Sequence, residues 1–255
     1  GDSGRHCLKT QATPKKKEKK KTNSKSLEKM TCHKIFIVVS LILAVSLVNA
    51  VEFSVVDNTG DSAGGRRFRD EIGGISYATE SLRAATDFTW SVFQQTNNPS
   101  DRRNPPMISM VMENGDYVAY SSEDKIRFNA GYLAGVSGDV RKEFTGIVYH
   151  EVVHSLQWDG AGQAPRMLVE GIADYVKLKA GYVSSDFVAP GGGDKWDQGY
   201  AVTARFLEYC SDFRSGFVAE LNKKMRGGYT DGFFVELLGK DVNQLWREYK
   251  ANYGQ

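Results

Sequence analysis

Two histidines four residues apart, His150 and His154, frame a glutamate at position 151 in the sequence His-Glu-Val-Val-His. On a helix, residues four apart lie one above the other on one face, so both imidazoles can reach the same small cation. Glu151 lies beside them, where a carboxylate can take a proton from a water activated by the metal. This HExxH spacing predicts two zinc ligands and a general base on one helical turn.

The third zinc ligand must come from another part of the chain, because a catalytic zinc normally has three protein ligands and an open position for water. The other two histidines, His6 and His33, lie in a segment that we expect to be removed on maturation. The metzincin pattern HExxHxxGxxH is excluded, because Gln157 and Gly160 occupy the positions that it requires. We therefore expect a carboxylate as the third ligand, with Cys210 as the less favoured alternative.

Glu170 and Asp174 are the candidates for that carboxylate, in the sequence Glu-Gly-Ile-Ala-Asp. Pro165 suits the first turn of a helix, so both acids would lie on one helical face. Like charges at this spacing repel by about a few tenths of a kcal/mol, so the pair calls for a cation or a donor nearby. Zinc on Glu170 and an imidazole N–H on Asp174 would satisfy both. An exchange of these two roles stays open, as does a solvated acidic face partly paired with Lys177.

Peptide hydrolysis also needs a donor for the negative charge that develops on the carbonyl oxygen. No third histidine is left for this role in the expected mature chain. Tyr200, Tyr182 and Arg166 are candidates, although residues of these types more often serve packing or solubility. We favour Tyr200 as a second catalytic residue beside Glu151.

The elements that must position these residues begin with a small sheet. Apolar and β-branched runs bounded by turn residues predict strands at 51–58, 107–112, 117–120 and 126–129. Turns at Asn114-Gly115 and at 121–124 join the last three strands, which predicts a hairpin sheet. The strand at 126–129 could be the sheet edge to which an extended peptide adds, by analogy with other zincins.

Helices are predicted around this sheet and through the rest of the chain. Residues 66–95 have apolar side chains at helical spacing, Ile75 among them, with a possible break at Gly73-Gly74. From residue 139 onward the pattern is almost wholly helical, with breaks at 160–164, 181–195 and 227–228. Asp139 is the expected N-cap of the metal helix, which should end near residues 159–160. Its buried stripe is predicted to contain Phe144, Ile147, Val148, Val152 and Ser155.

Two segments of the helical half allow a further interpretation. The glycine-rich stretch 189–194, followed by Trp196, is either a rim beside the cleft or a plain connector. Cys210 recurs at helical spacing with aromatic residues, which favours packing in the core over a reactive thiol.

The N-terminal region has the composition of processed or unfolded sequence. Residues 1–29 are rich in lysine and almost free of apolar residues, so we interpret them as a disordered or non-native extension rather than a nucleic-acid-binding tail. Residues 30–50 have a lysine, an apolar run and small residues at the end, which predicts a secretory signal peptide. An uncleaved membrane anchor is the alternative. We therefore expect a secreted, extracellular protein that begins at Val51.

The charge of the expected mature chain argues against two classes of partner. Residues 51–255 contain 22 Lys and Arg and 28 Asp and Glu, a net charge of −6. Nucleic acids and anionic membranes would both require a basic patch, so neither is the expected main partner.

About 205 residues can bury a sufficient core without disulfides, which suits a chain whose last 205 residues have Cys210 alone. We expect a monomer.

Three segments of the chain also carry a resemblance to a known family. They are HEVVHSLQW at 150–158, EGIADYVKLKAGY at 170–182 and KWDQGYAVTARFLEYC at 195–210. They resemble the plant basic secretory proteins, a family of pathogenesis-related extracellular proteins, and the likeness covers nearly all of residues 51–255. That family is grouped with the HExxH zinc peptidases, and its ExxxD element is similar to the third-ligand helix of gluzincins. The resemblance implies Glu170 as a ligand and Asp174 as the residue behind a histidine.

The sequence departs from the family pattern in two respects. Only 16 positions separate His154 from Glu170, a shorter insertion than in many gluzincins, and the expected mature chain is acidic. The ligand choice between Glu170 and Asp174 therefore stays open here.

These observations predict an α+β fold for residues 51–255. It would be a zincin-like metallopeptidase domain, with an N-terminal mixed or antiparallel sheet and helices followed by a mostly helical C-terminal half. The expected function is a secreted zinc metallopeptidase that hydrolyses peptides or proteins in the plant apoplast during defence. The alternatives are a zinc-binding defence protein without proteolytic activity and a ligand-binding module with structural histidines.

Overall fold

The computed structural model of the protein describes residues 50–254. Our expectations for a lysine-rich extension and for residues 30–49 of the signal peptide lie outside these residues. Within them, every helix is too short or too polar to cross a lipid bilayer.

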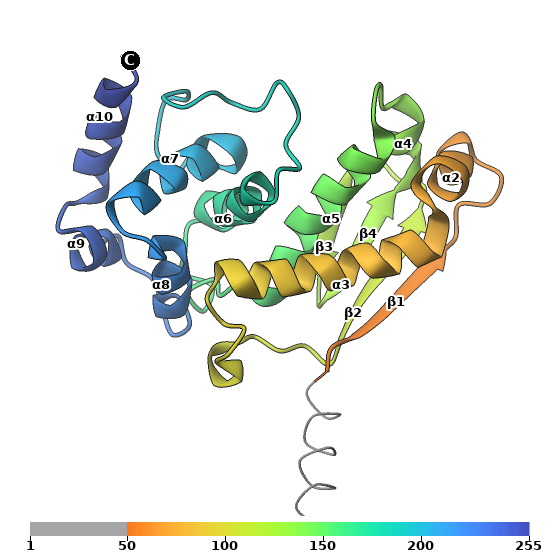
Figure 1. Cartoon of the computed structure of the whole chain (residues 1–255), viewed down its shortest axis with the longest axis horizontal. Coiled ribbons are helices and arrows are strands. Elements are labelled where there is room, and N and C mark those ends of the chain that lie inside the picture. The colour runs from red at the N-terminus through yellow and green to blue at the C-terminus, as the bar shows by residue number, and fades with distance from the viewer. Residues whose placement is uncertain (1–49, 255) are drawn as a thin grey trace, which may run out of the picture. The chain divides into compact units, whose positions relative to one another are not determined.

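The described strands form one mixed sheet of four strands in the order β1-β2-β4-β3 (Figure 1). Strands β1 (Glu52–Asp57), β2 (Met107–Glu113) and β4 (Lys125–Asn129) run parallel to one another, and β3 (Ala119–Ser122) is antiparallel to β4. The inner face of the central strands is fully buried and carries Ile108, Met110, Met112, Ile126 and Phe128. The four strands confirm the α+β class with a mixed sheet and the predicted strands, except that the third begins and ends two residues later than predicted.

The predicted hairpin between the second and third strands is wrong, because β2 pairs with β4 and not with β3. The segment after β2 crosses the end of β4 instead of turning back. The Asn129 side chain holds it there, since its Oδ1 accepts from the Gly115 N–H at 3.1 Å and its Nδ2 donates to the Tyr117 carbonyl at 2.7 Å. A turn signal shows where a strand ends but not which strand becomes its neighbour. The second predicted turn, between β3 and β4, is present but contains only Glu123 and Asp124, because Ser121 and Ser122 belong to β3.

The strand order also corrects the position of the free sheet edge. The strand predicted as that edge, β4, lies between β2 and β3. The edge on this side of the sheet is β3, which packs against helix α5 (Val140–Leu156).

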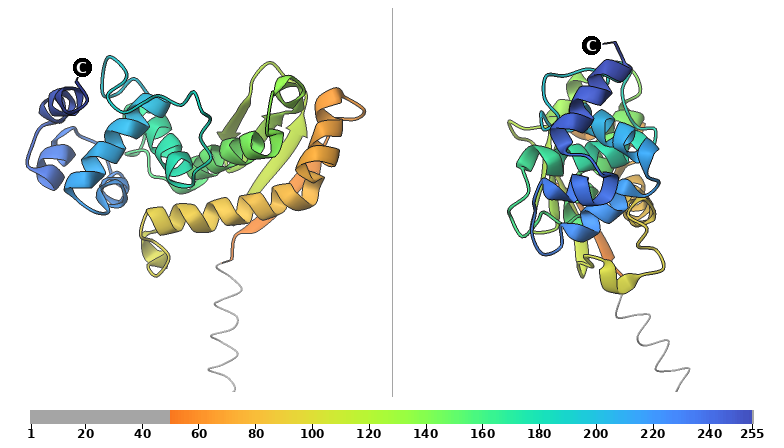
Figure 2. Two further views of the ribbon diagram at one scale, coloured as in Figure 1. Left: turned by 45° about the horizontal axis from the view of Figure 1, so that its top comes forward. Right: turned by 90° about the vertical axis from the view of Figure 1, so that its left-hand side faces the viewer.

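The first long helical segment is divided as the glycine pair predicted. Helix α2 (Ala63–Arg67) continues into a π-helical turn (Phe68–Ile72), which stops at Gly73 with a left-handed φ of 114°. Helix α3 (Gly74–Val92) follows and lies along the sheet (Figure 2). Ile75 lies in the first turn of the new helix, as the helical spacing predicted, but it is 48% exposed.

The second half of the described chain is helical, as predicted. Helix α4 (Ala130–Gly135) precedes α5, and five more helices follow it: α6 (Arg166–Lys179), α7 (Tyr200–Phe213), α8 (Phe217–Lys224), α9 (Gly232–Leu238) and α10 (Val242–Asn252).

The described helices and strands form two hydrophobic cores. One lies between the sheet, α3 and α5 and contains Phe68, Phe128 and Phe144. The other joins α6 to α10 and includes Phe206 and the buried Cys210, which confirms the packing interpretation of this cysteine. Figures 1 and 2 both show the sheet and the later helices on opposite sides of the α5–α6 pair.

The glycine-rich loop does not form a rim of the cleft. The Gly191 N–H donates to the Tyr249 hydroxyl at 2.7 Å, and Lys250 Nζ donates to the carbonyls of Gly191 and Gly193 at 2.7 Å each. Trp196 is buried in the helical core. This stretch is therefore a connector anchored to α10.

Candidate metal centre

Helix α5 carries the two histidines and is held firmly at both ends. The Asp139 side chain accepts from the Lys142 N–H at 2.9 Å, which confirms the predicted N-cap. The predicted buried stripe is also present, from Phe144 to Ser155. The helix ends at Leu156, earlier than predicted, because Gln157 has extended backbone while its N–H still donates to the Val153 carbonyl.

Helix α6 brings the two carboxylates to α5 and also packs closely against α7. Gly171 permits this contact, because a Cβ atom there would lie 2.3 Å from Thr203 Cγ2. Glu170 and Asp174 flank this glycine on the buried side of α6 and are 9% and 6% exposed. The alternative of a solvated acidic face is therefore wrong.

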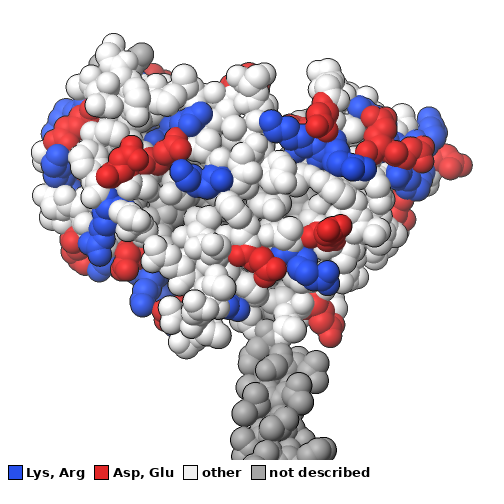
Figure 3. Space-filling model, viewed as in Figure 1, with Lys and Arg blue, Asp and Glu red and all other residues white. Residues whose placement is uncertain are grey.

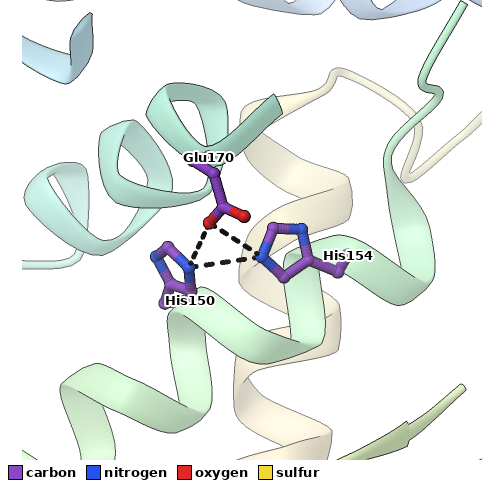
Figure 4. Close-up of side chains that lie close together, drawn as sticks. All are labelled: His150, His154 and Glu170. Atoms are coloured by element: carbon purple, nitrogen blue, oxygen red, sulfur yellow. Dashed lines mark hydrogen bonds and ion pairs between the residues drawn. The ribbon is translucent and has the colours of Figure 1, made fainter. Parts of the chain in front are cut away.

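Three side chains converge where α5 and α6 meet (Figure 4). His150 Nε2 lies 3.2 Å from His154 Nε2 and 3.2 Å from Glu170 Oε2, and His154 Nε2 lies 3.5 Å from the same oxygen. His150, His154 and Glu170 thus offer three ligand atoms to a single metal ion. Cys210 lies in the helical core and is not among them.

Asp174 occupies the other side of the His150 ring, with Oδ1 2.8 Å from Nδ1. Glu170 therefore faces the Nε2 atoms and Asp174 faces Nδ1, which favours the original assignment of the two acids over its exchange. Burial lowers the pKa of His150, but the hydrogen bonds to Asp174 and Glu170 outweigh burial and raise this pKa to about 9. Burial acts to raise the pKa of Glu170, yet the two histidines hold it well below its ordinary value. At neutral pH and without a metal, His150 is therefore positively charged and Glu170 is negatively charged.

Glu151 follows His150 on α5 and lines the same cleft. Its side chain is 6% exposed, and its Oε2 atom is buried without a hydrogen-bond partner within residues 50–254. A buried carboxylate oxygen without a partner is costly, so it favours a water or a substrate group at this position.

Tyr200 lies beside the cluster, whereas Tyr182 does not. The Tyr200 ring stacks on His150 at a centroid distance of 5.9 Å and an angle of 11°, while Tyr182 packs against Tyr149 at 4.9 Å and is not part of the cleft wall. Arg166, the third candidate donor, lines the cleft but is 80% exposed, with Nε 3.7 Å from Glu170 Oε1. Tyr200 is thus the best placed of the three candidates.

The backbone at Tyr200 is unusual for a residue with a side chain. Its φ of 45° lies in the left-handed region, which costs about 1–2 kcal/mol for a residue other than glycine. Gly199 before it contacts α6, since a Cβ atom there would lie 2.5 Å from Met167 Sδ. Burial, and then the charge of Glu170, raise the pKa of Tyr200, so its hydroxyl keeps a proton that it can donate.

The cluster lies in a cleft with a volume of about 830 Å³. One wall is the edge strand β3, which supplies Ala119, Tyr120 and Ser121, and the end beyond α5 carries Trp158 and Asp159.

Three cleft residues were absent from our sequence-based site. Ser121 Oγ donates to the Glu151 carbonyl at 2.8 Å, and Arg103 Nη1 donates to the His154 carbonyl at 3.1 Å. Gln157 Nε2 lies 2.8 Å from His154 Nδ1. Of these three residues, only Gln157 could have been identified from the sequence, because it lies three residues beyond His154.

Comparisons with known proteins point to a family of peptidases. A family model described as BSP, peptidase of plants and bacteria, matches residues 48–249. Over 60 residues the chain is 47% identical to a basic secretory protease of Boswellia serrata, a match that covers 24% of this chain and 69% of that relative. No solved structure matched the chain.

Proposed function

The chain belongs to the BSP family of peptidases of plants and bacteria, and from this premise we propose that it is a secreted zinc metallopeptidase with a zincin-like domain. The observation that carries the zinc assignment is the convergence of His150, His154 and Glu170 at the junction of α5 and α6.

The donor set fits zinc in both chemistry and spacing. Two imidazole nitrogens and a carboxylate oxygen are ligands of catalytic zinc sites. Ligands about 2.0–2.1 Å from a tetrahedral ion are separated by about 3.3 Å, and the observed separations are 3.2, 3.2 and 3.5 Å. Three protein ligands would leave a fourth position for water. Asp174 would hold the His150 ring in the correct orientation from behind.

Glu151 is the proposed general base. A zinc ion bound here would polarise the scissile carbonyl and lower the pKa of a water toward neutrality. Glu151 would accept a proton from the attacking water through its unpartnered Oε2 and later pass it to the leaving amine. Tyr200 donates its hydroxyl hydrogen to the carbonyl oxygen as negative charge develops there.

Substrate is proposed to bind along β3 and not along β4. The Asn129 N–H donates to the Val118 carbonyl, and in an antiparallel pair such bonds recur at every second residue. The backbone groups of Ala119 and Ser121 therefore point outward from the edge. An extended peptide can pair with them and pass over the metal ligands.

The remaining expectations follow from the family and the charge distribution. The name of the Boswellia serrata relative supports secretion, and a peptidase family implies a peptide or protein substrate. On the face shown in Figure 3, basic and acidic side chains are interspersed, which supports a protein that does not act on nucleic acid. We further propose a monomer that acts in plant extracellular defence.

The test combines metal analysis with a hydrolysis assay. Purified wild type should contain one zinc per chain and cleave a denatured protein or a peptide library. Glu151→Gln should retain the zinc and lose about 10²–10⁴-fold in kcat. Glu80→Gln, at an exposed position on α3, is the matched control and should behave as wild type.

Each contrary outcome points to a different conclusion. Equal activity of wild type and Glu151→Gln would exclude Glu151 as the base. Zinc-loaded wild type without hydrolysis would favour a zinc-binding defence protein, and wild type without stoichiometric zinc would favour a ligand-binding module.

A further inference from the structure

Gln157 lies directly behind the second histidine of the motif. It follows the last residue of α5, is 4% exposed, and its backbone N–H still donates to the Val153 carbonyl. Its amide nitrogen lies 2.8 Å from His154 Nδ1, the ring nitrogen that faces away from Glu170. Gln157 therefore lies next to Nδ1 of His154, as Asp174 lies next to Nδ1 of His150.

The group that faces Nδ1 of His154 decides which ring nitrogen can bind a cation. A histidine that binds a cation through Nε2 carries its proton on Nδ1, so the group that faces Nδ1 must accept a hydrogen bond. At His154 that group is the amide of Gln157.

An amide side chain can accept as well as donate, because a half-turn about its last bond exchanges the oxygen and the nitrogen. For Gln157 this half-turn would break no hydrogen bond of Oε1, which is buried without a partner among the residues that the structure describes. Asp174 can only accept, so it keeps a proton on Nδ1 of His150.

We propose that Gln157 is a positioning residue that selects the metal-binding tautomer of His154. With metal bound, Gln157 Oε1 would accept from His154 Nδ1–H and hold the ring toward the ion. Each histidine is then oriented by one side chain next to its Nδ1 atom, His150 by Asp174 and His154 by Gln157. This inference rests on the proposed metal site.

The experiment compares three chains that differ in what faces His154 Nδ1. Wild type can donate or accept, Gln157→Glu can only accept, and Gln157→Met has similar length without a hydrogen bond. Zinc affinity is measured by competition with a chelator, and the visible spectrum is recorded after cobalt substitution. Thermal unfolding of the metal-free forms reports any loss of folding.

Gln157→Met should bind zinc about 10–100-fold more weakly than wild type and shift the cobalt bands, because the ligand loses its support. Gln157→Glu should restore affinity to wild-type level or better and give wild-type cobalt bands. Equal weakening by both substitutions, or wild-type affinity of Gln157→Met, would overturn the proposal. Wild type that binds no zinc would instead overturn the metal site itself.

A second measurement does not depend on any variant being folded. Nitrogen-15 NMR of the histidine rings in zinc-loaded wild type shows which ring nitrogen of His154 carries the proton. We expect the proton on Nδ1, beside Gln157. A proton on Nε2 would contradict the proposal.

Discussion

The carboxylate of Asp174 lies 2.8 Å from Nδ1 of His150, while the opposite nitrogen of the same ring lies 3.2 Å from Glu170 Oε2. One imidazole is thus held between two acids from successive turns of α6. Asp174 faces Nδ1, so Nε2 is the nitrogen of His150 that could bind a cation, and Glu170 faces the same position.

Replacement of Asp174 should weaken zinc binding without removing a ligand. Asp174→Ala leaves the His150 Nδ1–H without an acceptor, and we expect a loss of about 10–100-fold in zinc affinity. Asp174→Asn keeps an acceptor oxygen but not the charge, so its loss should be smaller. Chelator competition measures both values. Equal affinities of Asp174→Ala and wild type would show that Asp174 does not support His150.

The metal-free protein should become less stable as the pH rises above neutrality. The pKa of His150 is raised from 6.5 to about 9 in the folded state, so its contribution is complete below about pH 6.5 and is lost as the pH passes 9. The contribution is at most about 3 kcal/mol. Urea unfolding of chelator-treated protein at pH 6.5 and 9.5 measures this change.

His150→Gln is the control for this pH dependence, because it lacks the titrating group. It should show a smaller loss between pH 6.5 and 9.5 than wild type. Zinc-bound protein should instead gain stability relative to the metal-free form over this range, since zinc displaces the proton. Identical pH profiles of metal-free wild type and His150→Gln would contradict the assignment.

Removal of the Tyr200 hydroxyl should lower kcat and leave zinc affinity unchanged. Tyr200→Phe keeps the ring that stacks on His150 at 5.9 Å but cannot donate to the carbonyl oxygen. We expect a loss of about 10²–10³-fold in kcat, with little change in KM. Steady-state kinetics on one peptide tests this. Tyr182→Phe, outside the cleft, is the control, and an equal effect of both variants would remove Tyr200 from the mechanism.

Loss of the Arg103 side chain should impair peptide binding at the sheet edge. Arg103 joins the His154 carbonyl, at 3.1 Å, to Asp124 Oδ1, at 3.2 Å, in the turn between β3 and β4. Arg103→Met frees this turn, so we expect kcat/KM for a long peptide to fall about tenfold, the equivalent of about 1.4 kcal/mol. Zinc affinity should change little. Lys125→Met, an exposed change at the first residue of β4, directly after this turn, should have no effect, and a comparable loss there would assign the effect to charge alone.

A methyl group at position 171 should disturb the proposed metal site through the contact between α6 and α7. The Cβ atom of Gly171→Ala would lie 2.3 Å from Thr203 Cγ2, so α6 and α7 must separate at a cost of about 1–3 kcal/mol. Zinc affinity should also fall, because Glu170 precedes this residue. Gly227→Ala is the control, since a Cβ atom there has no neighbour within 4 Å. Equal urea midpoints of the two variants would show that the α6–α7 contact is not tight.

The parts of the fold that depend on local sequence were predictable, and those that depend on distant pairing were not. The Asp139 cap, the division at Gly73 and the buried stripe of α5 follow from residues a few positions apart. The parallel pairing of β2 with β4 depends on the Asn129 side chain, which binds the backbone 12 and 14 residues earlier in the chain. No turn signal reports such a contact.

The same distinction applies to the site. The spacing of the two histidines and of the two acids predicted which residues would meet, because each pair lies on one helix. Arg103 and Ser121 could not be identified, because each donates a hydrogen bond to a backbone carbonyl of α5. Any donor of suitable length could make such a bond. The orientation of Glu170 and Asp174 toward different nitrogens depends on how α6 crosses α5.

The proposed metal site lies on the boundary between the two hydrophobic cores, since α5 packs mainly with the sheet and α6 with the later helices. A zinc ion held by His150, His154 and Glu170 would fasten these halves to each other. Residues 51–255 contain a single cysteine, so the ion would take the place that a disulfide has in many extracellular proteins. Chelation should then open the molecule as well as stop its chemistry.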